Sequence, residues 1–420
     1  MVTLSNTMLG GKAEGSGCTS WSGILFWLNA KAQSSKLYHL GNWDVEISGS
    51  NFIVARTTDI LSNAEMREQG YNVCEKALDI FCADGLGGFF IISPFERNLL
   101  ISNTDGKTAL WISCTEDFTI SMQATLSVQD KDGNIIRSSP RPQTAWENVY
   151  CYYRYSKLSN NIYDEYRWMY LVFEITMQKI APIGFDAVKN KPTEKEGRWI
   201  LRALREADTQ YGWIAAMNWP TTDPVMYFYN EQYNGVRCNL FHSKGGHLQP
   251  NEHISLDTVF KHLRELEKLC IYLLRRIYDI NTNGSIVTYS GFEMFMNSLF
   301  DNASAFLSEV NIKPLDSSLS LNDVNPFLCL DEIPEKAVRE NKVVIHVFHS
   351  RFPEGEERKV RSYGMKNGDE LAICDYPYEH TLSVQGIDDV YLIQMVKLVN
   401  KSDKKQHKHS GIVSSQQMSI

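Results

Sequence analysis

Two side chains of this sequence, Arg237 and His242, are suited by type and spacing to phosphodiester chemistry. Arginine keeps its charge at physiological pH and offers several donors to a phosphate, whereas histidine takes up and releases protons near neutrality. Such a pair can cleave RNA without a metal: the histidine accepts the proton of a ribose 2'-hydroxyl, and the arginine stabilises the charge that develops on phosphorus. Because DNA lacks this hydroxyl, the chemistry predicts an RNA substrate and requires no metal or cofactor.

A helix over about 223–242 is expected to carry both residues. Asp223-Pro224 suits the N-cap and first turn of that helix. With about 100° per residue, Arg237 and His242 border a polar face. Asn234 projects between them, so we expect it to supply a polar contact at the same site. The opposite sector is the predicted core face and consists of Val225, Tyr229, Tyr233, Val236 and Leu240.

Other residues could support or extend this site. Glu174 is predicted on a neighbouring helix, where its carboxylate could orient an arginine or a histidine; an ordinary salt bridge between helices is the alternative. Residues 152–155, Tyr-Tyr-Arg-Tyr, could stack bases and contact phosphate, although their predicted position at a strand end would bury half of them. His346 and His349 lie three apart in a predicted strand, which sends them to opposite faces and argues against a shared metal.

Hydrophobic periodicity predicts the elements that position these residues, and the predicted fold class is α+β. An N-terminal antiparallel β-domain with one covering helix is expected to precede a central helical bundle, whose last helix lies near 289–309, and a small C-terminal β-domain. The expected boundaries are 1–150 for the β-rich N-terminal domain with its helix at about 62–83, 151–310 for the bundle, 311–341 for a polar linker, 342–400 for the small β-domain, and 401–420 for a disordered tail.

Composition limits the possible partners and compartments. A net charge of -8 and a pI of about 5.7 argue against gripping a polyanion by bulk electrostatics, so any contact with nucleic acid must be local. The sequence has no apolar run long enough for a membrane span and does not begin with a secretory signal, so we expect a cytosolic protein without membrane contact. The nine cysteines lack a C-x-x-C pair, which argues against zinc and a disulfide framework, and we expect most to be buried thiols.

Three stretches of sequence carry a family resemblance. They are W-E-N-V-Y-C-Y-Y-R-Y-S at 146–156, Y-R-W-M-Y-L-V-F-E at 166–174 and Y-N-G-V-R-C-N-L-F-H-S-K-G-G at 233–246. An R-x-x-x-x-H motif in a late helix of a bundle resembles the HEPN (higher eukaryotes and prokaryotes nucleotide-binding) ribonuclease domain. The combination looks like the methylamine-utilisation J-type and ApeA-like HEPN proteins, over about residues 60–280.

The resemblance implies a HEPN-like bundle and a metal-independent endoribonuclease in which Arg237 and His242 are catalytic. It also implies a homodimer with a composite cleft and a role in prokaryotic anti-phage defence, with the flanking β-domains sensing a phage-derived or protein trigger. Many active members have Asn, Asp or His directly after the arginine, where this chain has Cys238. Two other readings stay open: a non-catalytic scaffold for dimerisation or for RNA or protein binding, and an accessory protein of amine metabolism.

Overall fold

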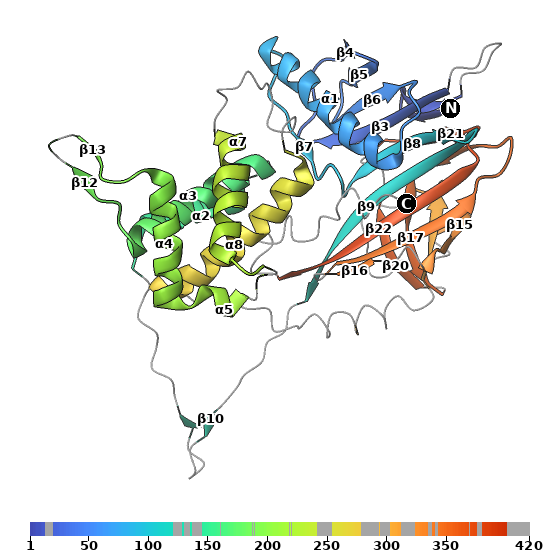
Figure 1. Ribbon diagram of the computed structural model, residues 1–420. Coiled ribbons are helices and arrows are strands. Elements are labelled where there is room, and N and C mark those ends of the chain that lie inside the picture. Colours follow the sequence, from blue (N-terminus) through green and yellow to red (C-terminus); the bar gives the residue numbers. More distant parts are fainter. Residues whose placement is uncertain are drawn as a thin grey trace. The chain divides into compact units, whose positions relative to one another are not determined.

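The computed structural model describes most of the 420-residue chain as two compact units. The described residues are 1–12, 20–120, 128–129, 135–136, 145–159, 161–186, 188, 190–217, 219, 221–241, 254–278, 294, 303–311, 324–334, 338–340, 343–368, 370–375 and 380–400. Met1–Ile120 and Val287–Ile420 form the first unit, called the sheet unit here (Figure 1). Ser121–Ile286 forms the second, called the helical unit. The predicted tail at 401–420 lies outside the described residues.

The N-terminal part of the sheet unit consists of nine strands. The strands are β1 (Val2–Leu4), β2 (Thr7–Lys12), β3 (Ser20–Leu28), β4 (Lys36–Leu40), β5 (Trp43–Ile47), β6 (Phe52–Thr57), β7 (Ile91–Ile92), β8 (Asn98–Thr104) and β9 (Lys107–Ile120). Asp105 and Gly106, between β8 and β9, both adopt positive φ. A two-residue hairpin turn of this kind matches the natural twist of an antiparallel pair, so β8 and β9 pair directly.

One helix, α1 (Asn63–Ala83), covers part of this sheet, where the periodicity predicts a helix. The Ser62 hydroxyl accepts a hydrogen bond from the Glu65 backbone, and the Glu65 carboxylate accepts one from the Ser62 backbone, which starts the helix with a capping box. α1 contacts β3, β5, β6 and β8. A Cβ at Gly70 would lie 2.4 Å from Cγ2 of Ile24 on β3, so glycine permits this close approach.

The C-terminal part contributes the remaining strands of the sheet unit. They are β14 (Ala303–Ser308), β15 (Pro326–Glu332), β16 (Val338–Glu340), β17 (Val343–Arg351), β18 (Glu357–Val360), β19 (Ser362–Asn367), β20 (Glu370–Asp375), β21 (Leu382–Gln385) and β22 (Asp389–Asn400). β14 lies where the periodicity predicts a helix, and β15 and β16 lie in the predicted linker. A short apolar run does not distinguish strand from helix, and here pairing with β19 makes residues 303–308 a strand.

β9 and β22 join the two parts of the sheet unit. They pair in parallel along the whole of β22, from Asp389 opposite Ala109 to Asn400 opposite Ile120, and β22 pairs with β17 on its other side. Eighteen strands of the described chain thus belong to one mixed hydrogen-bonded sheet. The predicted fold class, with two separate β-domains around a central helical bundle, is therefore wrong, because strands from both ends form one large sheet that dominates the structure.

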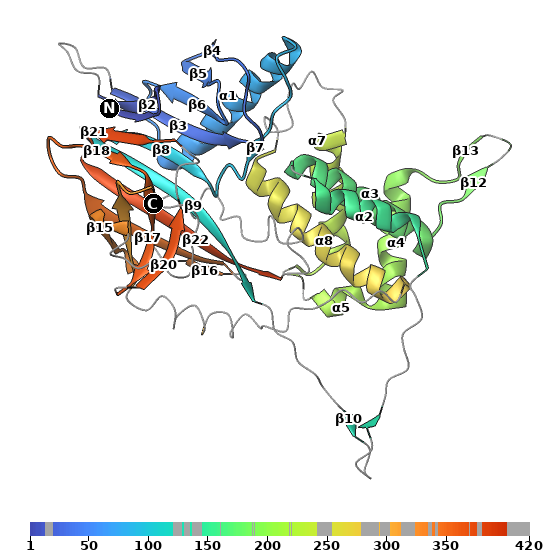
Figure 2. The same ribbon diagram turned by 180° about the vertical axis from the view of Figure 1, so that it is seen from behind.

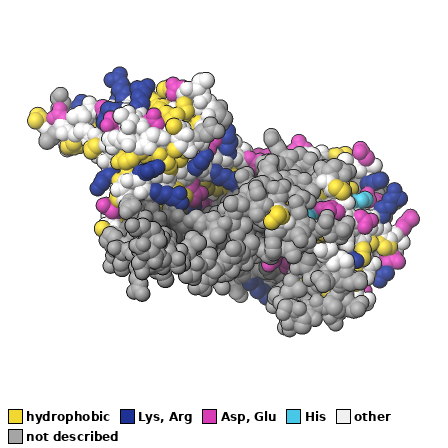
Figure 3. All heavy atoms as spheres, turned by 90° about the horizontal axis from the view of Figure 1, so that it is seen from below, with side chains coloured by type: hydrophobic (Ala, Val, Ile, Leu, Met, Phe, Trp, Pro, Cys, Tyr) yellow, Lys and Arg dark blue, Asp and Glu magenta, His cyan; other side chains and the backbone are white. Residues whose placement is uncertain are grey.

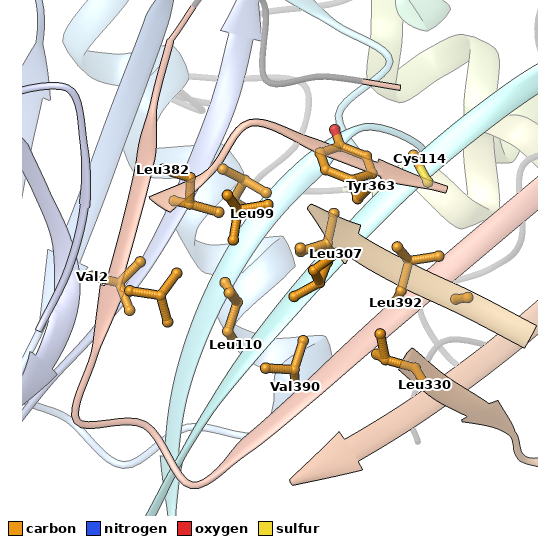
Figure 4. Close-up of a cluster of buried hydrophobic side chains, with 14 of the residues drawn as sticks. Val2, Leu99, Leu110, Cys114, Leu307, Leu330, Tyr363, Leu382, Val390 and Leu392 are labelled. Atoms are coloured by element: carbon orange, nitrogen blue, oxygen red, sulfur yellow. The ribbon is translucent and has the colours of Figure 1, made fainter. Parts of the chain in front are cut away.

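The two parts of the sheet unit also share one hydrophobic core (Figure 4). Leu110 and Ile112 of β9 point to the same face because strand side chains alternate, and Val390 and Leu392 of β22 lie on that face beside them. Leu307 of β14 completes the contact from the far end of the sequence. Each part therefore buries apolar surface that the other part covers.

The helical unit contains the predicted site. Its helices are α2 (Asn148–Leu158), α3 (Ile162–Ile180), α4 (Glu196–Tyr211), α5 (Trp213–Met217), α6 (Pro224–Phe228), the π-helix η1 (Tyr229–Arg237), α7 (Cys238–Phe241) and α8 (Leu256–Tyr278). Two small hairpins, β10 (Val128–Gln129) with β11 (Ile135–Ile136) and β12 (Phe185–Asp186) with β13 (Lys191–Pro192), also belong to it. α2 and α3 lie side by side, as Figure 2 shows from behind, and α3 also packs on α8.

None of the helices in the described part of the chain combines the length and the apolar character that a bilayer crossing requires.

Candidate functional site

The helix predicted over 223–242 begins as expected but changes type. The Asp223 side chain accepts a hydrogen bond from the backbone of Met226 and caps α6. From Tyr229 to Arg237 the backbone is a π-helix, with hydrogen bonds between residues five apart. A Cβ at Gly235 would lie 3.2 Å from the carbonyl oxygen of Asn230, five positions earlier, so glycine eases this conformation.

The wider turn changes which residues share a face. Each residue of a π-helix advances by less than the angle of an α-helix, so the predicted projection fails after Tyr229. Val236 and Leu240 are buried as expected, but Tyr229 and Tyr233 are only half-buried. Their rings stack on each other, with centroids 5.2 Å apart. They therefore belong to the side of η1 that faces α4.

Arg237 ends the π-helix in a cluster of carboxylates. Its Nη2 donates a hydrogen bond to Oε1 of Glu196 at 2.5 Å and lies 3.9 Å from Oε1 of Glu174. Glu174 comes from α3 and Glu196 from the first turn of α4, so three helices meet at this guanidinium. The Arg237 side chain is 12% exposed, which makes the ion pair partly shielded from water.

Aromatic rings surround the same guanidinium. Its carbon Cζ lies 5.1 Å from the ring centroid of Tyr233, 5.7 Å from that of Phe241 and 5.9 Å from that of Tyr170. The negative faces of aromatic rings attract a cation at such distances. The rings and the carboxylates together hold Arg237 in one place.

The surroundings raise the pKa of two groups in this cluster. Burial, assisted by the negative charge of Glu196, raises the pKa of Glu174 to about 7, although Arg237 acts in the opposite direction. Burial and the nearby Glu196 also raise the pKa of Tyr233 to about 12. Glu174 can therefore exchange a proton near neutral pH, directly beside a fixed positive charge.

The start of α4 is packed tightly against the stacked tyrosines. A Cβ at Gly197 would lie 2.7 Å from the hydroxyl oxygen of Tyr229 and 3.3 Å from Cε1 of Tyr233. The Tyr233 hydroxyl also lies 3.4 Å from Oε2 of Glu196. Gly197 therefore allows α4 to bring Glu196 to Arg237.

The predicted site residues are only partly brought together. Arg237 and Glu174 lie near each other, whereas Asn234 is exposed on η1. Cys238 is half-buried, and its side chain hydrogen-bonds with Arg237. His242 lies outside the described residues. The catalytic roles of Arg237 and His242 stay predictions.

Other predicted candidates have ordinary partners or a different structure. Residues 152–155 belong to helix α2 and not to a strand end. His346 is buried, with Nδ1 2.6 Å from Oε1 of Glu332, and His349 is a third exposed, with Nε2 2.8 Å from Oδ1 of Asp389. Each histidine therefore pairs with its own carboxylate. Of the eight described cysteines, three are buried, fewer than expected: Cys74, Cys114 and Cys270.

Sequence reasoning missed a buried polar network on the other side of η1. Gln232 is fully buried, accepts a hydrogen bond from the Tyr166 hydroxyl at 2.9 Å and donates one to the backbone carbonyl of His262 at 2.9 Å. Nδ1 of His262 lies 3.2 Å from Oε2 of Glu265. These bonds fix η1 between α3 and α8, so the π-helix is held from both sides.

The residues that complete the Arg237 cluster were also missed. Glu196 and Gly197 lie 41 and 40 positions before Arg237, on helix α4. A glutamate in the first turn of a helix is common, because it interacts favourably with the helix dipole, so its type gave no signal of a site.

Comparisons with protein-family models, with curated proteins and with solved structures found no match to this chain.

Proposed function

We propose that this protein is a metal-independent endoribonuclease in which Arg237 binds the scissile phosphate and His242 moves the proton of the ribose 2'-hydroxyl. The resting site holds Glu196 on the guanidinium of Arg237. A phosphodiester offers the same kind of anionic oxygen acceptor as a carboxylate, so the substrate replaces Glu196. Glu196 is 41% exposed, which leaves room for this exchange.

The observation that carries the proposal is the π-helix that ends at Arg237. π-helical turns are rare and occur frequently at functional sites. Here the unusual geometry, eased by Gly235, brings the guanidinium to a junction of three helices with a partly open carboxylate beside it. A salt bridge that served stability alone would form equally well from a regular helix.

Glu174 supports the chemistry through its proton. A carboxyl group with a pKa of about 7 is matched to the working pH of a general acid or base. When phosphate replaces Glu196, Glu174 keeps its place beside Arg237 and can take or give a proton. In the proposed attack, His242 takes the proton of the 2'-hydroxyl, the 2'-oxygen bonds to phosphorus and the bond from phosphorus to the 5'-oxygen breaks. We assign Glu174 a supporting role, in which it can give a proton to the leaving 5'-oxygen.

One face of the helical unit carries charges of both signs. Figure 3 shows dark blue Lys and Arg side chains there, with magenta Asp and Glu and yellow hydrophobic side chains among them. The net charge of -8 opposes bulk binding, so phosphate recognition is concentrated at few positions.

Dimerisation, compartment and biological role belong to the same proposal. We propose that two copies associate through the helical unit and present two Arg237 side chains to one RNA. We further propose that the enzyme acts in the cytoplasm against phage infection and responds to a phage-derived or protein trigger. Light scattering at several protein concentrations tests the dimer.

A second candidate is a non-catalytic scaffold that dimerises or binds RNA or a protein. The observation that favours it is the pairing of Arg237 with two carboxylates, Glu174 and Glu196, which neutralises the charge a phosphate requires. The two candidates differ in one respect: replacing Arg237 abolishes RNA cleavage if the protein is the nuclease, whereas the scaffold cleaves no RNA in either form.

The test is cleavage of labelled RNA in the presence of EDTA, with analysis of the product ends. Wild-type protein is expected to leave 2',3'-cyclic phosphates, and Arg237→Ala and His242→Ala are expected to abolish them. His39→Ala is the matched control, because His39 is an exposed histidine of the sheet unit. Cleavage that persists in both site variants, or that needs added metal, contradicts the proposal.

A further inference from the structure

The surface of α2 and α3 carries three aromatic rings, of which the ring of Trp168 contacts the other two. Tyr152 and Tyr155 are three residues apart on α2, and Trp168 comes from α3. The Trp168 centroid lies 6.0 Å from that of Tyr152, with an interplanar angle of 30°, and 5.2 Å from that of Tyr155. We call these three residues the aromatic face.

The hydrophobic core does not account for these rings. α2 buries Val149, Ser156 and Lys157, whereas Tyr155 is 40% exposed and Tyr152 and Trp168 are half-buried. Exposed rings in contact with one another offer flat apolar surfaces on which further planar groups can stack. Nucleic-acid bases are the planar groups that proteins commonly bind in this way.

The charges around the aromatic face suit the phosphates that accompany bases. The guanidinium of Arg154 lies 5.1 Å from the centroid of Tyr155 and is exposed. Arg167, next to Trp168, is also partly exposed and pairs with Asp164. α2 contains no acidic residue, although the whole chain has a net charge of -8. The aromatic face thus combines stacking surfaces with local positive charge.

The aromatic face and the Arg237 site share helix α3, and Arg167 links this helix to the chain after Arg237. Arg167 donates a hydrogen bond from Nη2 to the backbone carbonyl of Leu240, three residues after Arg237, at 2.9 Å. Trp168 and Glu174 are six residues apart on α3, which corresponds to about 9 Å along the helix axis and about 120° around it. A strand that stacks on the aromatic face therefore has to pass around α3 to reach Arg237.

We propose that the aromatic face binds single-stranded RNA by base stacking, with Arg154 contacting the backbone, and holds the strand next to Arg237. The choice of RNA over DNA rests on the proposed function, whereas the stacking rests on the aromatic face itself. Duplex RNA hides the base faces in its own stack, so the surface selects unpaired strands.

The experiment measures the affinity of the full-length protein for a fluorescent single-stranded oligonucleotide by anisotropy. The probe is 2'-O-methyl RNA, whose blocked hydroxyl prevents the proposed cleavage during the measurement. Tyr155→Ser and Trp168→Ser are each expected to weaken binding about ten-fold. Tyr155→Phe and Trp168→Phe keep a ring and are expected to stay within about two-fold of wild type, and their thermal melts report on folding.

A matched control uses an exposed ring elsewhere in the same unit. Phe185 on β12 is 61% exposed, and Phe185→Ser is expected to leave affinity unchanged. The proposal is overturned if the two serine variants bind as wild type does, if a duplex of the same length binds equally well, or if the serine substitutions only dissociate a dimer in light scattering. The last result identifies the surface as a contact between protein copies.

The same variants separate this proposal from the proposed function. If wild-type protein cleaves no RNA but the serine variants lose affinity, the stacking surface stands and the nuclease fails. If RNA is cleaved but the serine variants keep full affinity and activity, the nuclease stands and the stacking surface fails.

Discussion

The guanidinium of Arg237 donates a hydrogen bond at 2.5 Å to the carboxylate of Glu196, which lies 41 positions earlier on another helix. This contact occupies a donor of the guanidinium that a substrate phosphate would use. Under the proposed function, Glu196 is a competitor of the substrate, and under the scaffold alternative it is a structural partner. If Glu196 competes with the substrate, removing its charge strengthens RNA binding. If it supports the site, removing its charge weakens RNA binding.

Removing the charge of Glu196 is expected to strengthen RNA binding. Glu196→Gln keeps the size of the side chain but weakens its hold on Arg237, because hydrogen bonds to charged groups are about twice as strong as neutral ones. We expect the Kd for uncleavable RNA to fall about three- to ten-fold, at a cost of about 1 kcal/mol in stability. Titration with 2'-O-methyl RNA measures the change.

Glu194→Gln is the control for that titration. Glu194 lies close to the start of α4 and pairs with Arg202 at 2.5 Å. The substitution Glu194→Gln therefore removes the same charge from a similar ion pair. Its RNA affinity is expected to match wild type. Weaker binding by Glu196→Gln, with normal binding by Glu194→Gln, would show that Glu196 supports the site and does not compete with the substrate.

Glu174 is expected to make stability depend on pH. Its pKa is about 7 in the folded protein and about 4.3 in an unfolded chain. Because the folded pKa is the higher one, the stabilising effect is complete below the unfolded value and is lost as pH rises through the folded value. The free energy of unfolding therefore falls between about pH 4.3 and pH 7.

Glu174→Gln removes this contribution because glutamine does not titrate. Denaturant melts of wild type and variant across that range are expected to diverge, with the flatter profile in the variant. The difference between the two proteins isolates Glu174 from other groups such as Glu75, whose pKa burial also raises to about 7. If the free energies of unfolding of wild type and Glu174→Gln change in parallel with pH, the pKa of Glu174 is not raised.

The close packing at Gly197 is expected to make it intolerant of a side chain. The added methyl of Gly197→Ala would lie 2.7 Å from the Tyr229 hydroxyl, so the tyrosine stack has to move. Such overpacking costs about 1–3 kcal/mol and shifts Glu196 away from Arg237. Thermal denaturation measures the loss. Gly49→Ala, where an added Cβ meets nothing within 4 Å, is expected to be nearly neutral.

The shared core of the sheet unit predicts that a substitution in β22 loosens β9. Leu392 is fully buried and lies in register with Ile112 of β9. Leu392→Ala is expected to cost about 2–5 kcal/mol and to speed hydrogen exchange of the β9 amides. Leu37→Ala, at a half-exposed leucine of β4, is expected to change stability by less than about 0.5 kcal/mol. Unchanged exchange in β9 would indicate that the two ends fold independently.

Local sequence signals predicted elements better than their assembly. The predicted capping residue Asp223 marks a true helix start, because a cap involves residues only a few positions apart. The parallel pairing of β9 with β22 joins segments about 280 positions apart, and no turn or spacing in the sequence marks it. The expectation of two separate β-domains failed for this reason.

In the candidate site, too, local sequence signals identified single residues better than the contacts between helices. Glu174 and Arg237 were singled out by residue type and helical pattern, and they lie 3.9 Å apart. The π-helix was not predicted, because a pattern read at the angle of an α-helix assigns Tyr229 and Tyr233 to the core. Glu196 reaches Arg237 only through the packing of α4, which a local pattern does not encode.

The most direct test compares two arginines in cleavage of labelled RNA in EDTA. Arg237 and Arg202 each form an ion pair with a glutamate at 2.5 Å, but only Arg237 ends the π-helix. The proposed function predicts that Arg237→Ala lowers the cleavage rate at least about 100-fold, whereas Arg202→Ala stays close to wild type. Equal cleavage by the two variants, with folding intact, would contradict the assignment of Arg237 as the phosphate-binding residue.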